Sequence, residues 1–121
     1  MAARVACRSI YFTALHELEL GNALGLKRFR GEASEAQVIA AMNLIQEDLG
    51  SGVLVAPDSS RRIPFSYAAQ LALAHSPTIG CRSLDILHCA FADDLDAAEF
   101  VTTDERQSKL ALAMGLSWIP L

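Results

Sequence analysis

The stretch EFVTTDERQSKLALAMGLSWI, residues 99–119, contains a short apolar strand, a helix and a second short strand in direct succession. The first apolar run ends in the polar residues Thr102, Thr103 and Asp104. Asp104 can cap the helix, because an aspartate at this position accepts hydrogen bonds from free backbone N–H groups, and Gln107 fits the fourth position of a capping box. The stretch therefore predicts a strand–helix–strand unit, whose two strands run parallel.

The same alternation of short strands and helices extends through the rest of the chain. Thr13, Ser34 and Ser83 are expected to cap helices, and the helix before Pro77 is expected to stop at His75. Strands that alternate with helices imply parallel strands joined by right-handed crossovers in an α/β sandwich. The expected helices span about residues 14–29, 35–49, 64–75, 84–95 and 105–114, and the expected strands are 9–13, 53–55, 99–102 and 116–119.

Composition limits the class of protein. The 121 residues are 52% hydrophobic and 20% charged, which is typical of one globular domain with its own core. Three cysteines without CxxC spacing favour a reducing, cytoplasmic location, and neither a signal peptide nor an apolar run long enough for a membrane span is recognisable. The net charge of −4 argues against a protein that holds nucleic acid nonspecifically along a broad face.

Two further acids are expected near the edge where Asp104 lies. Asp85 follows the expected cap Ser83 by two residues, and the helix dipole stabilises a negative charge there by typically ~0.3–1 kcal/mol. Glu19 falls on the apolar stripe of its helix, whereas Glu17 lies about 160° away around the helix axis. A carboxylate buried without a partner is costly, so Glu19 is expected to have a cation or hydrogen-bond donors beside it.

Three carboxylates from three separate helix starts can share one cation. Acids that converge repel one another unless a positive charge lies between them. Oxygen ligands without Cys or His spacing favour a hard ion, Mg²⁺ or Mn²⁺, which stabilises the charge of phosphodiester hydrolysis and activates a water. Taken singly, Asp104 is explained by a helix cap, Asp85 by a first-turn charge and Glu19 by an internal ion pair with an arginine. The expectation of a metal site therefore depends on the three acids lying close together.

Three segments together resemble the PIN-domain family, which includes the VapC-type toxins of bacterial toxin–antitoxin pairs. RSLDILHCA (82–90) and EFVTTDERQSKLALAMGL (99–116) are similar to the C-terminal half of that family, and LHELELGNAL (15–24) is similar to the helix with its second acid. The resemblance implies a three-layer αβα sandwich with a parallel sheet. It also implies a Mg²⁺- or Mn²⁺-dependent endoribonuclease that acts on RNA, usually forms a homodimer and is neutralised by an antitoxin protein.

The resemblance also implies which residues form the site. Glu19, Asp85 and Asp104 correspond to catalytic metal ligands of the family, and Thr102 or Thr103 is expected near the metal.

One feature of the family is missing from this sequence. PIN domains open with a central strand that ends in an aspartate, the first metal ligand, whereas the strand at 9–13 corresponds to the family's second. We therefore expect a single PIN-like domain over residues 1–121 that is incomplete at its N-terminus, as a fragment, a misplaced start or a degenerate copy. The spacing of Asp58 does not suggest that it replaces the lost ligand. A truncated, non-catalytic module that binds a partner protein or RNA, and an unrelated small α/β domain, are the alternatives.

Several other residues are expected to have structural roles. His88, one turn after Asp85, is expected in or near the core. Phe65 and Trp118 are also expected in the core. Three acids at a helix end are expected to form a solvated face: Asp93, Asp94 and Asp96.

Overall fold

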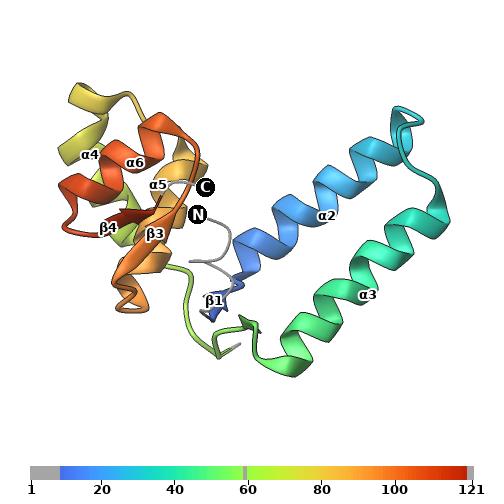
Figure 1. The fold of residues 1–121 in the computed structure, drawn as a ribbon. Helices are drawn as coiled ribbons and strands as arrows, with labels where there is room; N and C mark the ends of the chain where they lie inside the picture. Colours follow the sequence, from blue (N-terminus) through green and yellow to red (C-terminus); the bar gives the residue numbers. More distant parts are fainter. Residues whose placement is uncertain (1–8, 59, 120–121) are drawn as a thin grey trace. The chain divides into compact units, whose positions relative to one another are not determined.

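The computed structural model describes residues 9–58 and 60–119, which form five helices and four short strands (Figure 1). The chain divides into two compact units, one ending at Arg61 and the other beginning at Arg62. No helix within these described ranges is long and apolar enough to cross a membrane. The N-terminal unit contains β1 (Ile10–Tyr11), α2 (Ala14–Phe29), α3 (Glu35–Ser51) and β2 (Leu54–Val55). The C-terminal unit contains α4 (Phe65–Ile79), α5 (Ser83–Asp94), β3 (Glu99–Val101), α6 (Glu105–Ala113) and β4 (Ser117–Ile119).

The N-terminal unit is a pair of helices, α2 and α3, that lie side by side, with the strands β1 and β2 at the end away from the connecting turn (Figure 1). The two strands pair in parallel, as predicted. Both predicted helix caps are confirmed. Thr13 Oγ1 accepts from the His16 N–H at 3.4 Å, and Ser34 Oγ accepts from the Gln37 N–H at 3.1 Å. Each cap satisfies a backbone donor that the first turn of a helix leaves free.

The C-terminal unit contains the predicted strand–helix–strand arrangement, with β3 and β4 paired in parallel on either side of α6 in the sequence. Helix α5 packs against both α4 and α6, and its residues 86–91 are all buried. Leu110 of α6, Ile119 of β4 and Cys89 of α5 are the largest fully buried side chains among the described residues. Because α5 and α6 share this core, packing holds the first turns of the two helices in a fixed relation.

Some predicted boundaries and core positions are wrong. Helix α4 continues through Pro77 to Ile79, so that only Thr78 and Ile79 follow the proline in the helix. The helix ends at Gly80, whose φ of 73° lies in the left-handed region that favours glycine. Phe65 is 63% exposed and Trp118 is 40% exposed, so neither is a core residue. Phe65 is the first residue of its helix, and Trp118 lies in a two-stranded sheet, where both strands are edges.

A short hydrogen bond connects α4 to α5. The Tyr67 hydroxyl donates to Asp93 Oδ2 at 2.5 Å. Asp93 is therefore part of the packing between two helices, and the prediction that it belongs to a solvated face is wrong. The hydrogen bond to Asp93, followed by burial and by the negative charge of Asp93, raises the pKa of Tyr67 to about 12.

This contact is expected to lose its stabilising effect at alkaline pH. The contribution of Tyr67 is fully present below its ordinary pKa of about 10, because the phenol is then protonated in both folded and unfolded chains. As the pH rises through the folded pKa of about 12, the contribution disappears, since the unfolded chain gives up its proton first. Urea midpoints of wild type and Tyr67→Phe are therefore expected to differ more at about pH 8 than at about pH 11. A difference that does not change with pH would contradict this expectation.

Candidate metal centre

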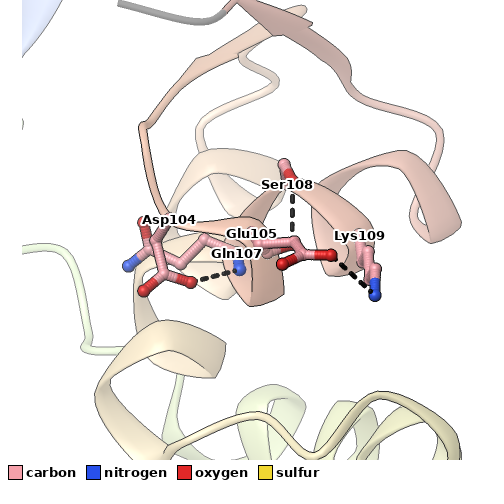
Figure 2. A network of polar contacts seen from close by, with 5 residues as sticks. All are labelled: Asp104, Glu105, Gln107, Ser108 and Lys109. Atoms are coloured by element: carbon pink, nitrogen blue, oxygen red, sulfur yellow. Dashed lines mark hydrogen bonds and ion pairs between the residues drawn. The ribbon is translucent and has the colours of Figure 1, made fainter.

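Asp104 lies between the end of β3 and the first residue of α6. Its Oδ1 accepts a hydrogen bond from the backbone N–H of Gln107 at 3.0 Å, which makes it the N-cap of the helix (Figure 2). The predicted cap is thereby confirmed. The side chain is exposed, and within the described part of the chain Oδ2 has no hydrogen-bond partner. One carboxylate oxygen of Asp104 therefore supports the helix while the other faces solvent.

The second half of the predicted capping box does not form. In a capping box the Gln107 side chain would accept from the backbone N–H of Asp104. That N–H donates instead to Thr102 Oγ1 at 3.0 Å. The Thr102 hydroxyl lies two residues before Asp104 and satisfies this donor locally, so the amide group of Gln107 is available for other contacts.

Gln107 uses its free amide to reach the other helix of the candidate site. Its Nε2 donates to Asp85 Oδ1 at 2.9 Å, and its Oε1 accepts from Thr102 Oγ1 at 2.6 Å. Asp85 of α5 and Asp104 at the start of α6 thus both accept hydrogen bonds from one residue. The structure brings these two predicted site residues together through Gln107, which sequence reasoning assigned only to a helix cap.

Asp85 lies in the first turn of α5, as predicted, and is half-buried. Its Oδ2 accepts from the backbone N–H of Arg82 at 3.3 Å. The prediction that Ser83 caps this helix is wrong, because α5 begins at Ser83 itself and the residue at the cap position is Arg82. The carboxylate of Asp85 satisfies the backbone N–H of the cap residue Arg82, so Asp85 also has a structural role.

Charged side chains of the candidate site also act on the pKa of the nearby Cys81 thiol. The pKa of the Cys81 thiol is raised, first by burial and then by the negative charge of Asp85. Arg106 acts in the opposite direction, and Asp104 raises the pKa further. Two carboxylates and one guanidinium are therefore within electrostatic reach of this thiol. A raised pKa keeps the thiol protonated at neutral pH.

Thr102 is the threonine that joins this network. It is buried, whereas Thr103 is exposed. Its backbone carbonyl accepts from the indole N–H of Trp118 at 2.9 Å, and its own N–H donates to the carbonyl of Ile119 at 3.3 Å. Strand β4 therefore fixes the position of Thr102, and the Thr102 hydroxyl in turn holds Gln107 and the backbone of Asp104.

Glu19 lies on α2 in the N-terminal unit. The expectation that it is buried on an apolar stripe is wrong, because Glu19 and Glu17 are both exposed. Leu18 and Phe29, two large apolar residues of the same helix, are 67% and 88% exposed. The pattern of apolar residues was present, but Leu15 is the buried residue of this helix. Burial therefore does not distinguish Glu19 from Glu17.

Asp58 lies in the N-terminal unit and His88 in α5 of the C-terminal unit. Asp58 Oδ1 accepts from both the backbone N–H and the hydroxyl of Ser60, and these hydrogen bonds lower its pKa. His88 is buried, as predicted, with 9% of its surface exposed. Among the described residues, no group of three or more His, Cys, Asp or Glu side chains is arranged to hold a metal ion. The C-terminal unit thus offers a pair of carboxylates.

This pair fits part of the ligand set of a hard cation. An ionised carboxylate has about four lone-pair sites, and Asp85 uses two of them while Asp104 uses one. Oxygen ligands of this kind suit Mg²⁺ or Mn²⁺, which complete their coordination with water or substrate oxygens. Comparison of the chain with protein-family models, with curated proteins and with solved structures found no match.

Proposed function

We propose that this chain is a divalent-metal-dependent endoribonuclease of the VapC type, which hydrolyses RNA phosphodiester bonds with Mg²⁺ or Mn²⁺. The observation that carries the proposal is the convergence of Asp85 and Asp104 on Gln107. The likeness of three sequence segments to PIN domains supports the same function and adds Glu19 as a third ligand. In this proposal the two parallel strand pairs belong to a three-layer αβα sandwich of the PIN type.

Each residue of the pair would have a distinct task. Asp85 and Asp104 hold the cation through oxygen atoms, and the hydrogen bonds of Gln107 and Thr102 keep the carboxylates oriented. A divalent cation at such a site stabilises the charge that develops on the phosphate and makes a water more acidic. Arg106 carries a positive charge in the same neighbourhood and can pair with a phosphate of the substrate.

Other surfaces suit the partners that the proposal includes. Basic residues at the end of α2 offer a local attraction for RNA phosphates that the net charge of −4 does not supply. Large exposed apolar side chains on α2 and α3 suit contact with a second copy of the chain or with an antitoxin protein. The basic residues are Lys27, Arg28 and Arg30, and the apolar ones include Leu18, Phe29, Ile39 and Leu44.

Metal removal is the first test. The purified chain is expected to cleave RNA in the presence of Mn²⁺ or Mg²⁺ and to stop when a chelator removes the ion, because the two carboxylates alone supply neither the Lewis acid nor the activated water. If Glu19 is the third ligand, Glu19→Gln is expected to raise the Mn²⁺ concentration needed for half-maximal cleavage roughly tenfold, since affinity depends on the number of charged ligands. Gel analysis of a labelled RNA over a Mn²⁺ titration measures both effects.

Glu17→Gln is the matched control for Glu19→Gln. Both residues lie on α2, both are exposed, and both variants remove one negative charge. An equal response of the two variants would remove Glu19 from the site. Cleavage that persists in excess chelator would contradict a metal-dependent enzyme.

The alternative is a non-catalytic module of the same fold that binds a partner protein or RNA. It is favoured because, among the described residues, no group of three or more His, Cys, Asp or Glu side chains is arranged to hold a metal ion. This alternative predicts RNA binding or partner binding without cleavage at any Mn²⁺ concentration. Gel-shift and cleavage measurements on the same RNA therefore separate the two functions.

A further inference from the structure

Gln107 donates hydrogen bonds to both acids of the proposed site. We propose that Gln107 is a positioning residue, which holds Asp85 and Asp104 ready for a shared divalent cation. This inference rests on the proposed metal-dependent function. It assigns a role to a side chain that is not one of the proposed metal ligands.

The contacts of Gln107 define the orientation of its amide group. The hydroxyl of Thr102 donates to Gln107 Oε1 and accepts the backbone N–H of Asp104, so it has no second proton to offer. The Nε2 group consequently points to Asp85 Oδ1. A flipped amide would direct Oε1 at an ionised carboxylate, which repels it, so the hydrogen-bond network assigns the orientation.

One residue holds both carboxylates. Gln107 donates its side-chain N–H to Asp85 Oδ1 and its backbone N–H to Asp104 Oδ1. Both acids also retain lone pairs for a cation, so the bridge and the cation do not compete for the same electron pairs.

Gln107 connects three segments of the C-terminal unit. Its backbone belongs to α6, Thr102 follows β3, and Asp85 belongs to α5. Removal of the amide leaves the backbone cap on Asp104 intact but frees Asp85 Oδ1. Outer partners of metal ligands typically contribute about 10- to 100-fold to metal affinity, because they fix the orientation of the ligand.

Replacement of Gln107 by methionine tests the proposal. Gln107→Met keeps the length of the side chain and a good helix former but loses both side-chain hydrogen bonds. It is expected to weaken Mn²⁺ binding at least about tenfold. Titration calorimetry, or electron paramagnetic resonance of free Mn²⁺, measures this on the full chain at a temperature where circular dichroism shows each variant folded.

Ser108→Ala is the matched control. Ser108 is the next residue of α6, is 4% exposed, and donates its hydroxyl to the carbonyl of Glu105 (Figure 2). It is expected to leave Mn²⁺ affinity within about twofold of wild type. A second measurement requires no metal: in nitrogen-15 spectra the side-chain amide signals of Gln107 are expected to shift strongly in Asp85→Asn and little in Asp94→Asn.

The outcomes separate this inference from the function on which it rests. If wild type binds no Mn²⁺, both are overturned. If wild type binds Mn²⁺ and Gln107→Met binds it as tightly as Ser108→Ala does, only the positioning role is overturned. Tighter binding by Gln107→Met would also overturn it, since the amide would then compete with the cation. Should Gln107→Met fail to fold, unchanged Gln107 amide signals in Asp85→Asn overturn the bridge.

Discussion

Leu110→Ala is expected to destabilise the C-terminal unit by about 2–5 kcal/mol, the usual cost of removing a buried leucine side chain. Leu110 is 0% exposed and is among the largest fully buried side chains of the described residues. Small domains have only about 5–15 kcal/mol of stability in total, so one such change removes a large part of it. Loss of this packing would also release the start of α6, where Asp104 and Gln107 lie.

Leu112→Ala provides the comparison, since it removes the same atoms from the same helix. Leu112 is 55% exposed, and its truncation is expected to cost less than about 1 kcal/mol. Urea unfolding followed by fluorescence measures both variants, because Trp118 is the single tryptophan and lies in this unit. Similar losses for the two variants would show that α6 does not hold the core as the structure indicates.

Local sequence patterns correctly predicted the features that depend on residues close together in the chain. The strand–helix–strand unit at the end of the chain, the parallel pairing and the caps at Thr13, Ser34 and Asp104 are all present. A cap requires a side-chain oxygen a few residues from a free N–H, and that requirement is visible in the sequence. Pro77 shows the limit of the same approach. The proline predicts a helix end before it, but α4 continues to Ile79.

The candidate site required more than local information. Asp85 and Gln107 are 22 residues apart, and their contact exists because α5 and α6 pack on one core. The spacing of Asp104 and Gln107 predicted a capping box, but Thr102 takes one half of that box and leaves Gln107 for Asp85. The partner of the Gln107 side chain can therefore be assigned only when it is known that Thr102 accepts the backbone N–H of Asp104.

The apolar stripe of α2 failed as a predictor for a different reason. Periodicity shows which residues share a face of a helix, but burial also requires something that covers the face. Leu18 and Phe29 follow the periodicity and are exposed. The inference that Glu19 is buried required such a cover. The assignment of Glu19 to the proposed site now rests on the likeness of residues 15–24 to the PIN-domain helix, and the comparison of Glu19→Gln with Glu17→Gln tests it.

Asp85→Asn and Asp104→Asn are each expected to reduce metal-dependent RNA cleavage at least about 100-fold, because either change would remove a charged ligand from the proposed cation, which would stabilise the transition state. Asparagine is nearly the same size as aspartate and is an equally good N-cap, so Asp104→Asn is expected to keep α6 intact. Single-turnover cleavage rates at saturating Mn²⁺ measure the effect on the chemical step, and circular dichroism confirms that the variants remain folded.

The double variant provides the sharper comparison. Two residues that act through one cation are strongly non-additive, so Asp85→Asn with Asp104→Asn is expected to be no slower than the slower single variant. Glu105→Gln is the charge control, because Glu105 is next to Asp104 and is exposed but pairs with Lys109 at 3.2 Å (Figure 2). Its rate is expected to stay within about threefold of wild type, since surface charges affect such a site only weakly. Losses that multiply in the double variant would mean that Asp85 and Asp104 act independently, and the shared-cation site would have to be abandoned.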